Sequence, residues 1–334
     1  MSEKKERIVF DVAYQPQVRT DRDTQRVMLD VMIALCPAVV IGAVNFGLHS
    51  LLVILTSMSA AVFFEWAYRK LLKKSPTIDD LTAALTGLLL ALVLPPQCAW
   101  WMPVIGSFFA IVVVKQLYGG LGKNFLNPAL AGRAFLMASY AGTMGMVVVD
   151  GVTMATPLSF LYSGEPLPYT AGQMVLGSIP GCIGEVSTLA LLAGGLYLIV
   201  RKVISWRIPV AFLGTVALLT LLGGHAGYSN GAWMLNNLLS GGLMLGAFFM
   251  ATDYATSPVT LNGQLLYGAG CGALTVLIRY FGGFPEGVSY AILIMNLCAW
   301  AIDKGFRRHQ FGVSKEDIAA EKAAKKAAKK EAVS

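Results

Sequence analysis

The sequence predicts an all-α, polytopic membrane protein with about ten transmembrane helices. Of its 334 residues, 56% are hydrophobic and only 13% are charged, and the mean hydropathy is +0.63. A soluble domain carries roughly twice that charged fraction. Apolar runs of about 17–22 residues recur from Val27 to Ile302, and each is long enough to cross a hydrocarbon core of about 30 Å.

Ten apolar segments follow one another along the chain and are the predicted spans. They are 28–47, 49–68, 79–95, 100–118, 126–141, 184–202, 207–223, 233–251, 264–281 and 286–303. The third and fifth are short or interrupted by glycine and proline, so we expect some partial spans. The start of the sequence is too polar for a signal peptide, so we expect the first span to be retained.

Basic residues predict the orientation of these spans. Lysine and arginine cluster before the first segment and after the second, fourth, sixth and tenth, which all lie on one side if ten spans alternate. The opposing connections, 141–183 and 224–232, contain neither residue. Because basic loops stay in the cytoplasm, we expect a multi-pass protein of the cell membrane with both termini cytoplasmic. Arg279, near the outer end of the ninth segment, is the one exception.

A short internal match divides the chain into halves. Residues 118–121 (Tyr-Gly-Gly-Leu) follow the basic Lys115, and residues 281–284 (Phe-Gly-Gly-Phe) follow Arg279. With five spans per half, the copies have opposite orientations, as in the inverted repeats of many transporters. The predicted parts are a cytoplasmic arm (1–26), a first repeat (27–141), an extracytoplasmic loop (142–183), a second repeat (184–304) and a basic cytoplasmic tail (305–334).

Charge and cysteine content exclude several classes of function. Much of the net charge of +7 comes from the lysine-rich tail, which is typical of a solvated end near an anionic leaflet and not of nucleic-acid binding. The five cysteines include no C-x-x-C pair, and only three histidines exist. Iron–sulfur and zinc sites need clustered thiolates or imidazoles, so we expect no metal site of the chain's own.

One polar stretch, from Asp150 to Thr156, lies in the predicted extracytoplasmic loop. It places a hydroxyl, Thr156, directly before Pro157 in a chain with few other reactive side chains. Two interpretations remain open on local grounds. Thr156 or Ser159 caps a helix that begins at Pro157, or Thr156 is a chemically used hydroxyl.

A second stretch is the glycine-rich loop from Gly119, which leads into a predicted half-helix. Asn127 is the expected cap and Pro128 the first helical residue. Such a helix start binds an anion or carbonyl in one interpretation, and packs closely through small residues in the other. Arg133 follows within the predicted span, where a guanidinium is costly unless it is paired or hydrated.

A third stretch surrounds Asp253 at the inner end of the eighth segment. Hydroxyl residues and Pro258 flank this acid. It either binds a cation or caps a break in a helix. Asp253 and Arg133 are therefore the two residues that we predict for an ion pathway.

The three stretches together carry a family resemblance over nearly the whole chain. Asp150, Thr153, Ala155 and Thr156 match the flavinylation motif D-x-x-[S/T]-G-A-T, in which the last threonine is esterified to the phosphate of FMN. Met154 stands where glycine is commoner. With the other two stretches, the chain resembles the D subunit of the Rnf ion-translocating oxidoreductase, and the related B subunit of the sodium-translocating NADH:quinone reductase. The length favours the Rnf subunit.

The resemblance implies a membrane subunit, not catalytic alone, that carries covalent FMN on Thr156. It implies electron relay coupled to sodium or proton transport, a flavin transferase that attaches the FMN, and a non-covalent riboflavin. Implied partners are the flavoprotein G subunit, the membrane A and E subunits, and the cytoplasmic B and C subunits. Asn127 and Arg133 are expected flavin or anion contacts. The alternative from the residues alone is a channel or secondary transporter with an inverted-repeat fold.

Overall fold

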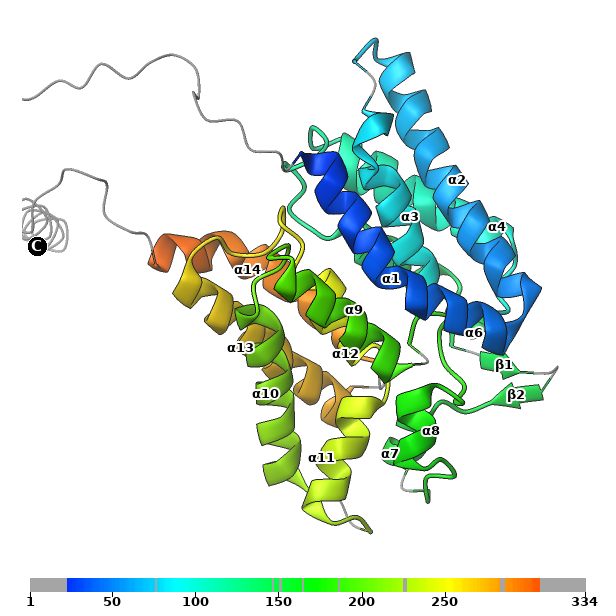
Figure 1. The fold of residues 1–334 in the computed structure, drawn as a ribbon, viewed down its shortest axis with the longest axis vertical. Helices are drawn as coiled ribbons and strands as arrows, with labels where there is room; N and C mark the ends of the chain where they lie inside the picture. Colours follow the sequence, from blue (N-terminus) through cyan, green and yellow to red (C-terminus); the bar gives the residue numbers. More distant parts are fainter. Residues whose placement is uncertain are drawn as a thin grey trace, which may run out of the picture.

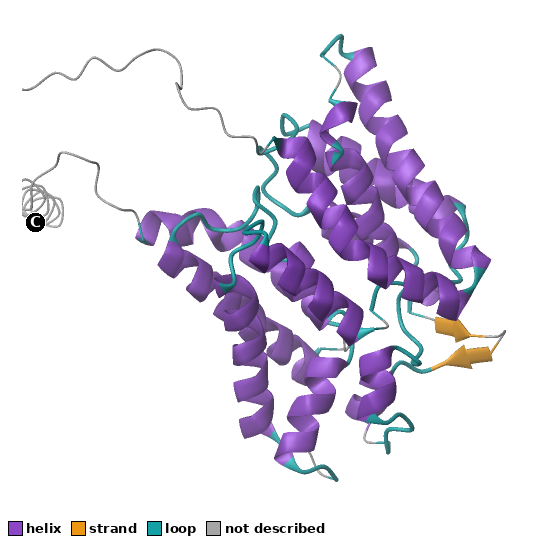
Figure 2. Cartoon of the chain, in the orientation of Figure 1, coloured by secondary structure: helices purple, strands orange, loops and turns teal. Residues whose placement is uncertain are grey.

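The computed structural model describes residues 23–75, 77–145, 147–149, 152–163, 165–185, 187–224, 227–282 and 286–306. Over these ranges the chain is a helical bundle in which the helices of the first half lie beside those of the second (Figures 1 and 2). One short antiparallel hairpin joins strands β1 (Val147–Val149) and β2 (Val152–Met154). The all-α prediction is right for the bundle and missed this hairpin.

The first half begins with two long helices and continues in shorter pieces. A π-helix, η2, extends α4 without interruption. The elements are α1 (Thr24–Phe46), α2 (Leu48–Leu71), η1 (Ile78–Asp80), α3 (Thr82–Leu92), α4 (Trp101–Phe108), η2 (Phe109–Gln116), α5 (Pro128–Ser139) and α6 (Ala141–Met144).

The connection between the halves contains two short helices, α7 (Pro157–Ser163) and α8 (Ala171–Leu176). The second half follows it and also contains a π-helix, η3. Its elements are α9 (Thr188–Val200), α10 (Arg207–Gly223), α11 (Asn230–Leu239), α12 (Leu243–Leu245), η3 (Gly246–Met250), α13 (Leu261–Phe281) and α14 (Val288–Gly305).

Three of the described helices, α1, α2 and α13, are long and apolar enough to cross a membrane. The predicted span 233–251 is not one straight helix, because α11 and the α12–η3 segment are bent by 65° at a break of a few residues. The third predicted span is helical only over α3, as expected for a partial span. Four shorter apolar helices are α3, α4 with η2, α9 and α10. The count of ten spans stays a prediction.

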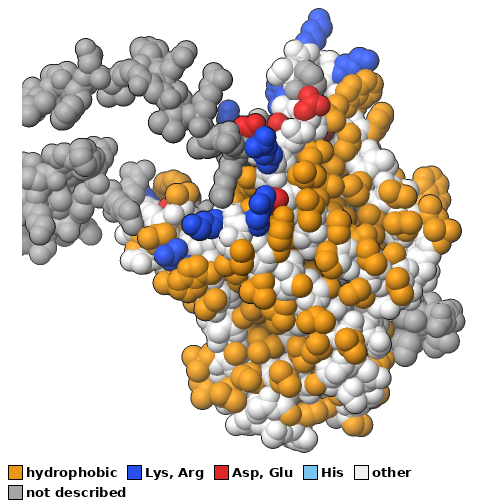
Figure 3. Space-filling model, viewed as in Figure 1, with side chains coloured by type: hydrophobic (Ala, Val, Ile, Leu, Met, Phe, Trp, Pro, Cys, Tyr) orange, Lys and Arg blue, Asp and Glu red, His pale blue; other side chains and the backbone are white. Residues whose placement is uncertain are grey.

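The surface is apolar over most of the visible face, and basic side chains gather towards one end of it (Figure 3). Large apolar side chains such as Val44, Leu55 and Leu222 are exposed on α1, α2 and α10. Exposed apolar area of this extent is typical of a surface that contacts lipid or other subunits. The surface therefore agrees with the membrane location predicted from composition.

Helices of the two halves contact each other directly. α1 packs on α9, and α5 packs on α14. At the first contact Gly194 of α9 lies so close to the backbone oxygen of Ala34 in α1 that a side chain at position 194 has no space. The halves also meet at non-helical backbone, where Gly184 N–H donates to Leu92 O at 2.8 Å and Ile183 N–H donates to Leu94 O at 3.1 Å.

A buried ion pair connects α2 with η2. Lys115 Nζ lies 2.7 Å from Glu65 Oε2 and donates to Thr82 Oγ1 at 2.7 Å. The other carboxylate oxygen of Glu65 accepts from Gln116 Nε2 at 3.0 Å and from Thr77 Oγ1 at 2.8 Å. Every charged atom of this pair has a partner, so the network holds α2, α3, η2 and the residue before η1 in one arrangement.

Candidate functional site

Thr156 lies at the start of α7, where β2 has ended. Its Oγ1 accepts from Ser159 N–H at 3.3 Å, and its carbonyl oxygen accepts from Ser159 Oγ at 2.7 Å. The helix cap that sequence reasoning left open is therefore present. Thr156 is half-buried and Ala155 is exposed. Both side-chain contacts of the hydroxyl are long, since its other neighbour, Ser159 Oγ, is 3.4 Å away.

The remaining motif residues are placed less completely. Thr153 lies in β2, and its backbone pairs with Val148 of β1. Asp150 lies outside the described residues. The hairpin and α7 together bring Ala155 and Thr156 to a short link between a strand and a helix, so the last two motif residues lie in an accessible turn.

An aromatic cluster holds α7 against the second half. Leu158 and Leu161 of α7 pack on Trp233 of α11, which is fully buried. Tyr162 OH donates to Asn237 Oδ1 at 2.9 Å, and Trp233 Nε1 donates to Tyr280 OH at 2.6 Å. The bond from Tyr162 and the apolar contacts with Trp233 fix the helix that begins beside Thr156 to α11.

Asn127 caps α5, as the sequence predicts. Its Oδ1 accepts from Ala129 N–H at 3.1 Å and Leu130 N–H at 3.3 Å, and its Nδ2 donates to Met250 O at 3.2 Å. The side chain therefore connects the start of α5 to the end of η3. It also lines a narrow cavity of about 80 Å³ that reaches Asp253.

Arg133 points into a different place, so it does not share a site with Asn127. Its Nη2 bonds Glu286 Oε2 and its Nη1 donates to Ser289 Oγ at 2.9 Å. Nη1 also lies 3.5 Å from Glu185 Oε1, and Nη2 lies 3.8 Å from Cys182 Sγ. The buried guanidinium is thus paired with two acids, as its predicted cost in a membrane requires.

Sequence reasoning missed Glu185 and Glu286. They lie 101 residues apart and join only because the loop before α9 meets the start of α14. The available signal was Arg133 itself, since a guanidinium within a span requires acidic partners. Cys182, Glu185 and Glu286 present ligand atoms within 4.8 Å of one another, although Arg133 faces the carboxylates.

Asp253 follows η3, in the connection to α13, and none of the residues that contact Arg133 lines either of the cavities that Asp253 lines. Its carboxylate accepts from Thr256 Oγ1 at 3.1 Å. Burial raises the pKa of Asp253 above the ordinary range of an aspartate. The structure therefore separates the two residues predicted for one ion pathway into two sites.

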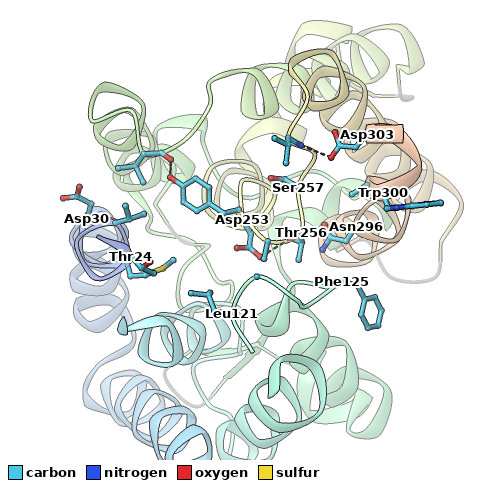
Figure 4. Close-up of a pocket in the computed structure, with 18 of the residues that line it drawn as sticks. Thr24, Asp30, Leu121, Phe125, Asp253, Thr256, Ser257, Asn296, Trp300 and Asp303 are labelled. Carbon is cyan, nitrogen blue, oxygen red and sulfur yellow. Dashed lines mark hydrogen bonds between the residues drawn. The ribbon is translucent and has the colours of Figure 1, made fainter. Parts of the chain in front are cut away.

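Asp253 also lines a cavity of about 960 Å³. Figure 4 shows Asp253 and Thr256 near its middle, with Asn296, Trp300 and Asp303 of α14 along one wall. Two other acids of the lining are already engaged. Asp30 pairs with Arg201 at 3.1 Å, and Asp303 accepts from the Val259 and Thr260 backbone, each at 3.0 Å.

Comparison with known proteins identifies the family. The model of the NQR2, RnfD, RnfE family matches residues 11–312. The chain is 47% identical over 311 residues to the D subunit of the Na⁺-translocating ferredoxin:NAD⁺ oxidoreductase complex of Acetobacterium woodii, covering 91% of this chain and 96% of the relative.

Two further relatives carry related names. The chain is 45% identical over 325 residues to the D subunit of the proton-translocating ferredoxin:NAD⁺ oxidoreductase complex of Clostridium ljungdahlii, covering 92% of this chain and 97% of the relative. It is 36% identical over 351 residues to the D subunit of an ion-translocating oxidoreductase complex of Escherichia coli, covering 92% and 100%. These matches confirm the resemblance to the Rnf D subunit that the motifs indicate. The chain belongs to the NQR2, RnfD, RnfE family.

Proposed function

We propose that this chain is the D subunit of an Rnf-type membrane complex that couples ferredoxin:NAD⁺ oxidoreduction to transport of Na⁺ or H⁺. The observation that carries the proposal is the similarity to D subunits over more than nine-tenths of this chain and of each relative. The chain is one part of the enzyme, and its electrons arrive and leave through the other subunits. These include the flavoprotein G subunit, the membrane A and E subunits and the cytoplasmic B and C subunits.

Covalent FMN on the Thr156 hydroxyl is the redox carrier in this proposal. The position fits an attached group for two reasons. Ala155 beside it is exposed, and the hydroxyl itself makes only contacts of 3.3 and 3.4 Å, so esterification displaces no strong hydrogen bond. The flavin supplies electron transfer when bound, while α7, packed on Trp233, fixes the point of attachment.

The test is fluorescence of the denatured protein on a gel, after production in a host with the flavin transferase. Wild-type protein is expected to fluoresce and Thr156→Ala to be dark. Thr156→Asn is the sharper variant, because asparagine retains the helix cap but has no hydroxyl to esterify. Fluorescence of Thr156→Asn would overturn the assignment.

The matched control is Thr170→Ala. Thr170 caps α8 in the same connection, with its own capping box. Thr170→Ala removes a helix cap, as Thr156→Ala does, so the two variants disturb folding in a similar way. Thr170→Ala is nevertheless expected to keep the gel fluorescence. A dark wild type would favour the channel or secondary-transporter alternative.

The second, non-covalent flavin is proposed for the cavity of about 960 Å³. That volume suits a flavin-sized ligand, and Phe125, Tyr254 and Trp300 supply aromatic walls. With Asp30 and Asp303 engaged elsewhere, Asp253 faces the cavity as an acid without an ion pair among the described residues.

Acid precipitation of the purified complex tests this assignment, because it releases only non-covalent flavin. Wild-type complex is expected to release riboflavin. Ser257 lines the cavity, so Ser257→Trp fills part of its volume and is expected to reduce the release of riboflavin. The gel fluorescence from the flavin on Thr156 is expected to stay unchanged. Full release from Ser257→Trp would argue for another location.

The proposed orientation places both termini in the cytoplasm and the connection with Thr156 outside. The absence of lysine and arginine from residues 141–183 supports it. Glu165→Cys, at an exposed position of that connection, is expected to react with an impermeant maleimide added to intact cells. The background for this experiment replaces Cys36 and Cys298, the two exposed cysteines.

We also propose that the ten predicted spans form two inverted repeats. Equivalent helices meet across the halves, as a two-fold axis requires: α1 on α9, and α5 on α14. The third span of each half is broken, at the end of α3 and between α11 and α12. Broken helices at corresponding positions are typical of transport proteins that bind their ion between two repeats.

A further inference from the structure

The loop before α9 brings two acidic side chains to the buried face of Arg133. Glu185 belongs to that loop, and Glu286 precedes α14 by two residues. Their carboxylate oxygens lie within 4.8 Å of each other, and Arg133 contacts both. The side chains of Arg133 and Glu185 are only 8% and 3% exposed, so water screens this cluster weakly.

The charges of this trio do not balance. One guanidinium faces two carboxylates, which leaves one excess negative charge when both acids are ionised. The Glu185 side chain is 3% exposed and that of Glu286 is 19% exposed, so two ionised carboxylates this close favour the binding of one further proton or cation. Consistent with this, Glu185 Oε1 is buried and has no hydrogen-bond partner among the described residues.

No other described side chain that faces the trio neutralises it by direct contact. Cys182 lies in the same loop and carries a thiol, which is uncharged at neutral pH unless its surroundings lower its pKa. Arg279 of α13 is the next cation. Its guanidinium instead donates to the carbonyl oxygens of Asn237 at 2.8 Å and Ser240 at 3.1 Å, at the end of α11. Those carbonyls complement its charge locally.

We propose that Glu185 and Glu286, bridged by Arg133, form a site for one monovalent cation, a proton or a sodium ion. The complex would exchange this cation during ion transport. This inference rests on the proposed function and adds to it the residues that hold the ion. Carboxylate oxygens are suitable ligands for a hard cation and accept a proton equally well. On the Glu286 side of Arg133, a cavity of about 10 Å³ that Glu185 does not line has room for about one water-sized species.

The position of the site connects it to the broken spans of both halves. Its loop is hydrogen-bonded to Leu92, the last residue of α3, and to Leu94, just beyond that helix. On the other side, Glu185 Oε1 packs against Gly242 in the break between α11 and α12, where a side chain has no space. Movement of either break therefore changes the surroundings of Glu185, which is the requirement for binding and release of an ion.

The test uses the assembled complex in inverted membrane vesicles, with ferredoxin oxidation driving NAD⁺ reduction. Glu185→Gln keeps the shape of the side chain and removes the excess charge. Loss of one charged contact weakens binding by about 10- to 100-fold, so we expect ion uptake per NADH formed to fall by about that factor when the ion concentration is below saturation. The exposed Glu165, in the same connection, provides the control Glu165→Gln, which is expected to transport normally.

Two measurements distinguish the ions. Uptake of radioactive sodium that resists a protonophore identifies Na⁺, whereas acidification that needs no Na⁺ and collapses with a protonophore identifies H⁺. In both cases Glu185→Gln loses the uptake that wild type shows. Normal uptake of either ion by an assembled Glu185→Gln complex would overturn the inference.

Further experiments keep the inference testable if Glu185→Gln does not assemble. Glu286→Gln removes the same excess charge and is expected to lose uptake in the same way. In wild-type complex, a hydrophobic carbodiimide is expected to modify Glu185 or Glu286 at acidic pH, because it reacts with protonated, buried carboxyl groups. If NaCl protects the glutamates from the carbodiimide and choline chloride does not, the bound ion is sodium. Equal labelling in the two salts indicates a proton. Absence of label from both glutamates would contradict the proposed site.

These outcomes are separate from those of the proposed function. Wild-type vesicles without ion uptake, together with a dark wild-type gel band, would contradict the proposed function itself. Wild-type uptake and fluorescence with a fully active Glu185→Gln would contradict only the site. Retained gel fluorescence in Glu185→Gln shows that the protein is inserted and flavinylated.

Discussion

The buried pair of Lys115 and Glu65 permits a prediction in which two substitutions at one contact have unequal effects. Glu65→Gln removes the carboxylate and leaves the Lys115 ammonium bonded to the neutral Thr82 Oγ1, with Asp80 as a more distant acid. Lys115→Met leaves the Glu65 carboxylate, which still accepts from Gln116 at 3.0 Å and Thr77 at 2.8 Å. The ammonium left without its ion-pair partner in Glu65→Gln therefore keeps fewer hydrogen bonds than the carboxylate left in Lys115→Met.

The magnitudes follow from these contacts. Removing one partner of a buried ion pair destabilises a protein by about 3–5 kcal/mol, which we expect for Glu65→Gln. Two retained hydrogen bonds to the carboxylate, each contributing roughly 1.5–3 kcal/mol, reduce the loss in Lys115→Met. The double variant, which combines Glu65→Gln with Lys115→Met, leaves no buried charge at this contact. We therefore expect it to be more stable than Glu65→Gln alone.

Reaction of buried cysteines with a thiol dye measures the effect during heating. Cys98, Cys182 and Cys271 are buried and report unfolding, while the exposed Cys36 and Cys298 are first replaced by alanine. We expect the midpoint temperature to be highest for wild type, lower for Lys115→Met and lowest for Glu65→Gln. A midpoint for Glu65→Gln equal to that of wild type would refute the reasoning, as would a double variant less stable than either single one.

Three further changes test other contacts. Asn127→Ala removes the cap of α5 and is expected to cost about 1 kcal/mol, read as a lower midpoint in the same dye assay; an unchanged midpoint would contradict the capping role. Gly194→Ala forces α9 away from Ala34 and is expected to lower the midpoint, whereas Gly214→Ala, which meets open space, is not. Asp253→Asn removes a carboxylate whose folded-state pKa is raised, so wild type loses stability as pH rises and the variant does not. The stability gain of Asp253→Asn over wild type should grow from acidic to neutral pH, and a constant difference would contradict this.

Local sequence signals predicted those parts of the fold that depend on neighbouring residues. Asn127 and Pro128 begin α5 as their residue types require, and Thr156 caps the helix that starts at Pro157. Apolar runs placed a helix within each predicted span. These features need only contacts within a few positions along the chain.

Features that depend on distant residues were not predictable in this way. The break between α11 and α12 lies inside an apolar run, and Gly241 and Gly242 alone do not distinguish a bend from close packing. The acids that pair with Arg133 come from two connections, and nothing local to Glu185 or Glu286 indicates their meeting. The hairpin at β1 and β2 was missed because six strand residues in a loop carry little signal.

The backbone bonds from Gly184 and Ile183 to the chain beyond α3 have a consequence for synthesis of the protein. Leu92 O and Leu94 O receive their donors from residues made about ninety positions later. A bilayer interior offers no water to take the place of those donors. We therefore expect that α3 cannot complete its C-terminal hydrogen bonds as it leaves the ribosome. The carbonyls of Leu92 and Leu94 gain these donors only when the loop before α9 arrives, so the end of α3 reaches its final structure together with the second half.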